Sequence, residues 1–157
     1  MTVNNKFMMN VSAKSANESF ARACISAFAA QLDPTLEEVN DIKTAVSEAV
    51  TNCIVHAYRE KIGKIYITGE LLEGNIIRIK IRDTGCGIPE KYRESIFQPF
   101  FRVDKSRSRE NGGVGLGLAL VWEIVALHGG EIRVEESSEK GTTVAVKLPT
   151  DMKTKLL

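Results

Sequence analysis

The strongest constraint on the fold is a change in the spacing of apolar residues in the middle of the chain. Residues 77–82 read "IRIKIR", so that apolar and charged side chains alternate strictly. Residues 65–71 alternate in a similar way. A period of two describes strands that have one buried and one polar face, as is common in antiparallel sheets. The chain must therefore supply an apolar layer to cover one face of a sheet.

Helical spacing of apolar residues flanks these strands. Residues 17–32 and 36–58 each carry an apolar stripe, and Pro34 separates them because proline cannot continue a helix. Residues 113–127 predict a further helix. The predicted stripes contain Phe20, Cys24, Ala27 and Phe28 in the first helix, and Leu36, Val39, Ile42, Val46, Val50, Cys53 and Ile54 in the second.

Short strands complete the prediction. We expect one strand near residues 6–12 and two strands around a turn near Lys140 and Gly141. Helices grouped on one face of an antiparallel or mixed sheet form an α+β two-layer sandwich. Residues 1–150 contain no repeat or linker, so we predict a single domain there, with residues 151–157 as a flexible tail.

Composition and charge argue against several classes of protein. The 157 residues include 21 basic and 20 acidic side chains, and a net charge of +1 favours neither nucleic acid nor a membrane surface. The start of the chain lacks the apolar run of a signal peptide, and the longest apolar stretch is too short to span a bilayer. Cys24, Cys53 and Cys86 show no metal or disulfide spacing. We therefore expect a cytoplasmic protein.

Glu48, Asn52 and His56 recur every four residues on a helix that is otherwise apolar. Four residues advance a helix by about 400°, so the side chains of Glu48 and Asn52 point into the same region. His56 is predicted to line that region or to cap a polar contact. His128, at the end of another predicted helix, is expected only to favour the C-terminal end of the helix dipole.

The stretch "RDTGCGIP" places Asp83 at the end of an apolar strand, followed by Gly85 and Gly87. A carboxylate at this place can accept a hydrogen bond from an exocyclic amine, and the glycines let the backbone approach a flat ring. A plain loop is the alternative interpretation, because Asp and Gly are common turn residues.

A second glycine stretch places Gly113, Gly115 and Gly117 just ahead of a predicted helix. Free backbone N–H groups and the positive end of a helix dipole suit phosphate. The spacing fits neither the dinucleotide fingerprint nor the P-loop, and a flexible connector is the alternative.

The segment between the two glycine stretches is basic and contains Arg102, Lys105, Arg107 and Arg109. Such a charge run is commonly a solvated loop. It could equally form a mobile lid whose cations meet phosphates while the neighbouring phenylalanines anchor its hinge.

The order of these motifs is more specific than any one of them. E-x-x-x-N on a helix is followed by D-x-G-x-G after a strand, a basic segment, G-x-G-x-G before a helix, and "GTT" before the last strand. Over about residues 36–148 this order resembles the GHKL ATP-binding superfamily, which includes gyrase, Hsp90, histidine kinases and MutL. The resemblance implies a Bergerat fold that binds ATP together with Mg²⁺.

The same resemblance implies a role for each matching residue. Asn52 would coordinate Mg²⁺, which takes oxygen ligands and keeps several waters, and Glu48 would act as the general base. Asp83 would bind the adenine amine. The remaining matches are Gly85 and Gly87 along the base, Thr142 beside Asp83, and Lys105, Arg107, Gly113, Gly115 and Gly117 around the phosphates.

The segment 17–58, which begins "NESFARACISAF", resembles the sporulation anti-sigma factors that are small serine protein kinases. Such proteins are homodimers that bind a sigma factor and phosphorylate a serine of an anti-anti-sigma (STAS) protein. Glu18 and Arg22 match positions that contact partners in that family, and surface solvation is the alternative for both.

The stretch from "IFQPFFRVDKSRS" to "VALHGGEI" resembles the catalytic domain of a sensor histidine kinase instead. A histidine kinase phosphorylates a histidine on a dimerisation helix, and no histidine precedes His56 in this chain. Two alternatives to the serine kinase therefore stay open. One is a detached catalytic domain that acts on a separate histidine protein, and the other is a regulatory ATP-binding module without kinase activity.

Overall fold

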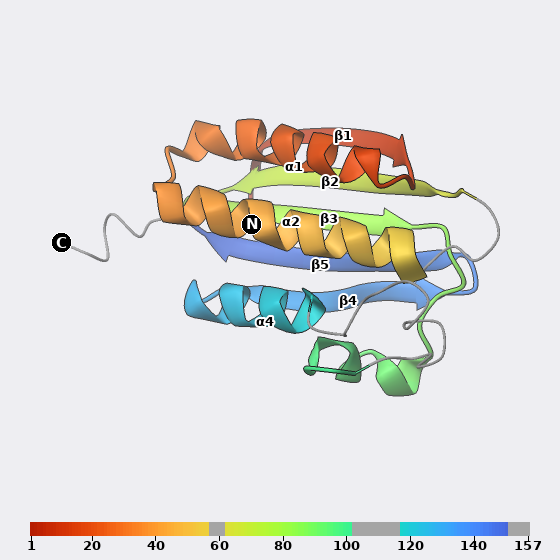
Figure 1. Cartoon of the computed structure of the whole chain (residues 1–157). Coiled ribbons are helices and arrows are strands. Elements are labelled where there is room, and N and C mark those ends of the chain that lie inside the picture. The colour runs from red at the N-terminus through yellow and green to blue at the C-terminus, as the bar shows by residue number, and fades with distance from the viewer. Residues whose placement is uncertain (57–61, 102–116, 151–157) are drawn as a thin grey trace.

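The computed structural model describes residues 1–56, 62–101 and 117–150, which form one sheet and one layer of helices (Figure 1). The strands are β1 (Val3–Ser12), β2 (Lys64–Leu72), β3 (Ile76–Asp83), β4 (Glu131–Ser138) and β5 (Gly141–Pro149). The α-helices are α1 (Ala16–Ala29), α2 (Leu36–His56) and α4 (Gly117–Leu127). Short 3-10 helices occur at η1 (Ala30–Leu32), η2 (Glu90–Tyr92) and η3 (Ser95–Phe97).

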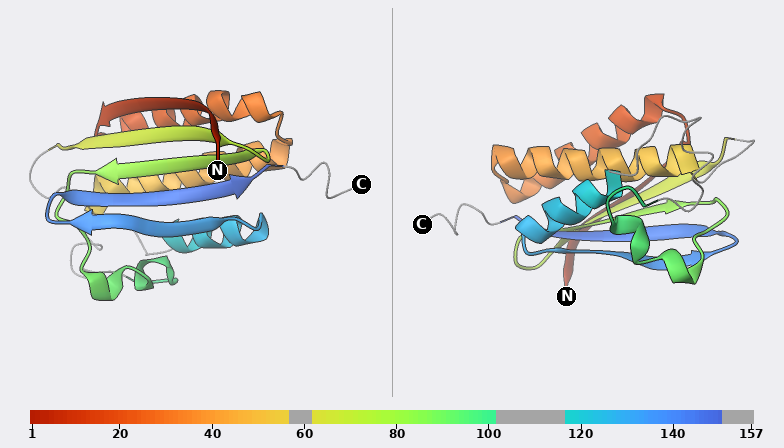
Figure 2. Two further views of the ribbon diagram at one scale, coloured as in Figure 1. Left: turned by 180° about the vertical axis from the view of Figure 1, so that it is seen from behind. Right: turned by 60° about the horizontal axis from the view of Figure 1, so that its bottom comes forward.

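The five strands form one sheet in the order β1-β2-β3-β5-β4, and every neighbouring pair is antiparallel. Helices α1, α2 and α4 lie on the same face of this sheet, as the views from the front and from behind show (Figures 1 and 2). The predicted α+β two-layer sandwich is confirmed.

The inner face of the sheet carries the apolar half of each alternating segment. Ile65 and Ile67 of β2 and Ile79 and Ile81 of β3 are at most 3% exposed. Each fully buried side chain of this kind stabilises the fold by about 1.5–3 kcal/mol. The same pairing places Asp83 opposite Ile65, so the strand carries a carboxylate on its buried side at its very end.

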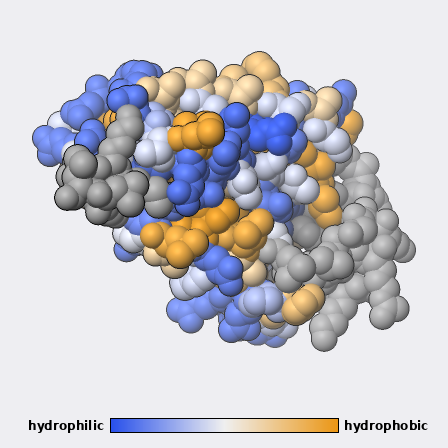
Figure 3. All heavy atoms as spheres, turned by 60° about the vertical axis from the view of Figure 1, so that its left-hand side comes forward, coloured by the Kyte–Doolittle hydropathy of each residue, from blue (hydrophilic) through white to orange (hydrophobic). Residues whose placement is uncertain are grey.

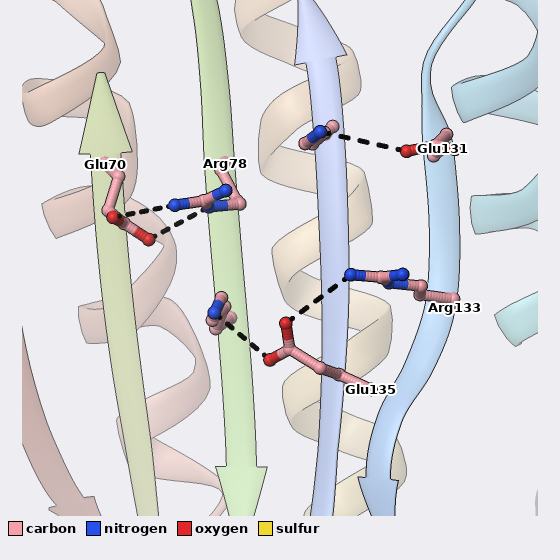
Figure 4. A network of polar contacts seen from close by, with 7 residues as sticks. Glu70, Arg78, Glu131, Arg133 and Glu135 are labelled. Atoms are coloured by element: carbon pink, nitrogen blue, oxygen red, sulfur yellow. Dashed lines mark hydrogen bonds and ion pairs between the residues drawn. The ribbon is translucent and has the colours of Figure 1, made fainter. Parts of the chain in front are cut away.

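The outer face carries the charged half, and the helices lie behind it in Figure 4. The Arg78 guanidinium donates to both carboxylate oxygens of Glu70 at 3.0 Å, which lowers the pKa of Glu70. Lys80 Nζ lies 3.1 Å from a carboxylate oxygen of Glu135. The Glu70–Arg78 pair joins neighbouring strands, the Lys80–Glu135 pair reaches across β5, and both occupy the face that the helices leave open.

The buried face of α1 differs from the prediction. Phe20 is 54% exposed, whereas Ala21, Ile25 and Ala29 are fully buried. Phe28 is half-buried and packs on Phe7 of β1 with ring centroids 4.6 Å apart. The helix is thus rotated so that small and branched side chains face the core, while an aromatic pair closes its edge.

Leu36 is also not part of the buried stripe of α2, since it is 77% exposed. It is the first residue of the helix, and the helix start is held by a capping box instead. The Thr35 hydroxyl accepts from Glu38 N at 3.1 Å, and Glu38 Oε1 accepts from Thr35 N at 2.8 Å.

Leu127 is 80% exposed, and Figure 3 shows apolar surface between hydrophilic patches on one side of the molecule.

Element boundaries depart from the prediction at several places. Strand β1 begins at Val3 rather than near residue 6, and α1 ends in a 3-10 turn. The turns η2 and η3 have no counterpart in the prediction. The predicted end of α2 near residue 58, the predicted start of α4 at residue 113 and the tail 151–157 lie outside the described residues.

Candidate functional site

The elements that carry the predicted site residues meet at one end of the sheet. Strand β3 ends where its antiparallel neighbour β5 begins, so that Asp83 comes next to Thr142. The C-terminal part of α2 lies over the same end, on the right in Figure 1, and α4 starts nearer the middle of the view. Chain segments far apart in the sequence thus contribute to one site.

Asp83 is the buried acceptor of this site, with 8% of its surface exposed. Its Oδ1 accepts hydrogen bonds from the backbone N–H groups of Gly85 at 2.9 Å and Thr142 at 3.2 Å. The buried thiol of Cys53, on α2, affects the pKa of this carboxylate. The side chain is therefore held by the loop that follows β3 and by β5.

Burial and hydrogen bonding act on the pKa of Asp83 in opposite directions. Desolvation is the larger effect and raises the pKa, while the donors from Gly85, Thr142 and Cys53 lower it. Burial, together with the nearby Asp83 charge, raises the pKa of the Cys53 thiol well above its usual value. The thiol therefore stays protonated and can donate a hydrogen bond.

The loop after Asp83 is tied to the β4–β5 hairpin. Ser137 Oγ accepts from the backbone N–H of Ile88 at 2.8 Å and lies 2.8 Å from Thr142 Oγ1. Arg93 Nη2 donates to the Ser137 carbonyl at 2.7 Å. Gly87 has φ +83°, and a Cβ there would collide with the backbone of Ser138. These contacts fix the loop close to the hairpin.

Glu48 lies at the other end of the site, where α2 meets the start of α4. A Cβ on Gly117 would collide with Glu48 Oε2, so the glycine permits this close approach. Asn52 is half-buried one turn later on the same helix. The structure thus brings Glu48 next to Gly117 of the second glycine stretch.

Glu48 also borders a polar groove of about 510 Å³ between α1 and α2. The groove is lined by Arg22, Asn40, Lys43, Thr44, Ser47 and Glu48. Arg22 Nη1 lies 3.5 Å from a Glu18 carboxylate oxygen, and the same carboxylate accepts a hydrogen bond from Ser47 Oγ. The predicted partner residues and the predicted base therefore share one open surface.

Comparison with known protein families shows to which family the chain belongs. Residues 37–152 match the family of histidine kinase-, DNA gyrase B- and HSP90-like ATPases. The chain belongs to this ATPase family. The match runs from the second residue of α2 past the end of β5 and so includes Glu48, Asn52, Asp83 and Thr142. The family assignment makes the chain a member of an ATP-using class of enzyme.

Several relatives extend the similarity to almost the full chain. An anti-sigma F factor from Caldanaerobacter subterraneus is 46% identical over 92% of this chain and 93% of its own length. The anti-sigma F factors of Geobacillus kaustophilus and Bacillus subtilis are 39% and 40% identical, over 91% and 89% of this chain and the same shares of their own lengths.

Two solved histidine kinase structures share this fold. The mycobacterial sensor histidine kinase MprB matches with a TM-score of 0.57 and 28% identity over 71% of each chain. The catalytic domain of histidine kinase ThkA matches with a TM-score of 0.60 and 23% identity, over 92% of this chain and 98% of that one. The latter similarity supports the fold alone.

The site residues fit an adenine nucleotide of the kind that this ATPase family uses. Asp83 offers a buried acceptor, the backbone of Gly85 lies close to it, and the backbone of Gly87 lies against that of Ser138. In the described parts of the chain no group of three or more His, Cys, Asp or Glu side chains could hold a metal by itself. A metal ion at Asn52 would therefore depend on nucleotide phosphates and water for its other ligands.

Some predicted site residues lie outside the described part of the chain. These are Lys105, Arg107, Gly113 and Gly115, together with the predicted lid. The prediction for His128 is corrected: it is 3% exposed, and its Nε2 lies 2.6 Å from Asp41 Oδ2 of α2. Its contact is therefore an interhelical one, beyond any effect of the helix dipole.

Sequence reasoning also missed residues that shape the site. Cys53 was assigned only to an apolar stripe, and Ser137 and Arg93 were not singled out. The pairing of Ser137 with Thr142 could have been found from the hairpin register around residues 140–141. The contacts of Cys53 and Arg93 have no local sequence signal, because they join segments that meet only in the folded chain.

Within residues 1–56, 62–101 and 117–150, no helix has the length and apolar character that a membrane crossing needs.

Proposed function

We propose that the chain is an ATP-dependent serine protein kinase that also acts as an anti-sigma factor. It would bind a sigma factor of the sporulation type and phosphorylate a serine of an anti-anti-sigma (STAS) protein. Relatives that are 38–46% identical over most of the chain and carry the name anti-sigma F factor support this proposal.

The observation that carries the proposal is the position of Glu48. It borders both the start of α4 at Gly117 and the open groove that contains Arg22. A group at this place can reach a protein acceptor from the groove and a nucleotide from the site. A carboxylate buried only for structural reasons would not border an open groove, and an isolated surface carboxylate would not lie next to Gly117.

Nucleotide binding is assigned to residues at both ends of the site. Asp83, Thr142, Gly85 and Gly87 would hold the adenine. Gly117, together with Gly113, Gly115, Lys105 and Arg107, would hold the phosphates. Asn52 would hold Mg²⁺, which supplies charge neutralisation at the phosphate oxygens when it is bound.

The proposed chemistry uses Glu48 as a general base. The acceptor serine oxygen bonds to the γ-phosphorus as the bond from that phosphorus to the ADP oxygen breaks. Glu48 accepts the proton that the serine hydroxyl loses, so the products are phosphoserine, ADP and protonated Glu48. Residues of the groove would orient the acceptor segment for this step, in which positioning matters more than covalent participation by the protein.

Further parts of the proposal concern assembly and location. We propose Glu18 and Arg22 as partner-binding residues and a homodimer as the working form. We also propose that residues 1–150 act as one kinase domain in the cytoplasm, with 151–157 as a tail.

A detached histidine-kinase catalytic domain is the second candidate, because MprB is 28% identical over 71% of this chain. One experiment separates the candidates. The purified chain is incubated with γ-labelled ATP, Mg²⁺ and either a STAS protein or a histidine-containing helical hairpin from the same organism, and the modified residue is mapped. A label on serine that resists acid supports the proposal. An acid-labile, alkali-stable label on histidine supports the second candidate, and bound ATP without transfer to either protein would overturn the assignment as a kinase.

A further inference from the structure

The groove between α1 and α2 contains a row of three polar side chains in contact with one another. The hydroxyl of Ser47, on α2, donates a hydrogen bond to Oε1 of Glu18, on α1. The same Oε1 lies 3.5 Å from Nη1 of Arg22, one turn later on α1. Ser47 and Arg22 both line the groove beside Glu48. One carboxylate oxygen is therefore shared by a hydroxyl from α2 and a guanidinium from α1.

The ion pair on α1 is looser than another pair of the same residue types in the molecule. The Arg78 guanidinium donates to both carboxylate oxygens of Glu70 at 3.0 Å. The contact between Arg22 and Glu18 joins Nη1 to Oε1 at 3.5 Å, and 41% of the Arg22 side chain is exposed. Side chains four residues apart on a helix can reach each other, so a two-bond pair is within their range. A guanidinium has five N–H donors, and this contact leaves most of those of Arg22 to other acceptors.

We propose that Ser47 is a positioning residue of the partner surface, because its hydroxyl holds the Glu18 carboxylate against α2 and keeps it from forming a bidentate pair with Arg22. This inference rests on the proposed function, in which Arg22 binds a partner protein. A guanidinium with two bonds to its own helix would have to break them before it could bind a carboxylate or carbonyl oxygen of the partner. Ser47 keeps the guanidinium available in the groove, next to the proposed general base.

Three variants separate this role from packing between the helices. Ser47→Ala removes the hydroxyl and leaves the helix intact, because alanine favours a helix. Ser19→Ala is the matched control, since Ser19 is exposed on α1 and its hydroxyl donates to the Ala16 carbonyl of the same helix. Arg22→Ala, alone and combined with Ser47→Ala, tests whether Ser47 acts through the guanidinium. A role in packing alone would weaken partner binding equally with and without Arg22.

The test is surface plasmon resonance of the full chain with the sigma factor and with the STAS protein, in Mg-ADP so that no phosphate is transferred. We expect Ser47→Ala to weaken binding of at least one partner by about three- to tenfold, the factor that one hydrogen bond supplies. Ser19→Ala should stay within about twofold of wild type, and Ser47→Ala should add less than about twofold to the loss caused by Arg22→Ala. The inference is overturned if Ser47→Ala binds both partners like wild type, if it loses as much in the Arg22→Ala background, or if Ser19→Ala loses as much.

A second measurement needs no partner protein. Rotation of the Arg22 guanidinium about its Cζ–Nε bond, measured by ¹⁵N NMR in the free protein, should slow in Ser47→Ala, because two bonds to one carboxylate hold the guanidinium in one orientation. It should stay at the wild-type rate in Ser19→Ala. An unchanged rate in Ser47→Ala would overturn the inference, because the hydroxyl then does not keep the pair apart. If Arg22→Ala binds both partners as tightly as wild type, the proposed partner surface itself is wrong, and the rotation rate still shows whether Ser47 positions Glu18.

Discussion

The two ends of the candidate site are built in different ways. At the proposed adenine end, Asp83 is 8% exposed and receives backbone donors from a loop and a strand. At the transfer end, Glu48 is half-buried and borders an open groove between two helices. One end is therefore fixed by the sheet, and the other is accessible from solvent.

This difference matches two different tasks. Recognition of a small rigid base gains from an acceptor whose orientation is settled before binding. Transfer of phosphate to a protein requires that a hydroxyl group on another molecule can reach the proposed general base, Glu48. Substitutions at the adenine end should consequently change nucleotide binding, whereas substitutions at the transfer end should change the reaction or the partner.

The largest effect is expected for Glu48→Gln. The amide is of the same size but cannot accept the serine proton, so the rate of phosphate transfer should fall by about 10²- to 10⁴-fold. ATP affinity, measured by calorimetry, should stay within about twofold of wild type because the substitution leaves the residues proposed to bind adenine unchanged. Transfer at the wild-type rate would remove Glu48 from the base role. A parallel loss of ATP binding would instead place Glu48 among the binding groups.

The next largest effect is expected for Asp83→Asn. The amide oxygen can keep the bonds from Gly85 and Thr142, but the amide N–H₂ group would then face the adenine amine, donor against donor. ATP affinity should fall about 100-fold, the cost of a lost charged hydrogen bond and an unpaired group. Glu73→Gln, an exposed substitution in the β2–β3 turn at the other end of these strands, is the matched control. Equal ATP affinity in the Asp83→Asn variant and in this control would contradict the adenine assignment.

A smaller effect is expected at the groove. Arg22→Ala removes a guanidinium that lines the groove beside Glu48 and should weaken binding of the sigma factor or the STAS protein by about tenfold. Arg133→Ala is the control, since Arg133 is 69% exposed on the outer face of the sheet. Surface plasmon resonance with each partner measures both. Equal affinities for the two variants would show that the groove does not contact that partner.

The sheet and the inward position of Asp83 could be predicted from the sequence. Alternation along residues 77–82 predicts the buried face of β3, and the same face places Asp83 inward. The orientation of α1 could not be predicted, because Phe20 and Ala21 both fit a helical period. Which of them faces the core depends on how closely α1 packs on the sheet, and that is decided by contacts between elements.

Contacts between distant segments were the least predictable part of the site. Nothing near His128 indicates Asp41 as its partner. This pair forms because α2 and α4 pack against each other on one face of the sheet. Gly87, by contrast, could be found from the sequence because its left-handed backbone is a local requirement.

The smallest expected effect is a pH dependence that Asp83 gives to the stability of the fold and to ATP affinity. Desolvation raises the pKa of Asp83 above its ordinary value of 3.8, so the folded chain holds this proton more tightly than the unfolded chain. Its contribution to stability is therefore present at low pH and is lost as the pH rises from 3.8 through the raised pKa of the folded state.

Over the same interval ATP affinity should increase, because only the ionised carboxylate has both oxygens free of a proton. Urea unfolding of Asp83→Asn beside Glu73→Gln should show the pH dependence flattened in this window for the first variant alone. If both variants follow the wild-type curve, burial does not disfavour the charge on Asp83, and the adenine end is more open to water than its contacts imply.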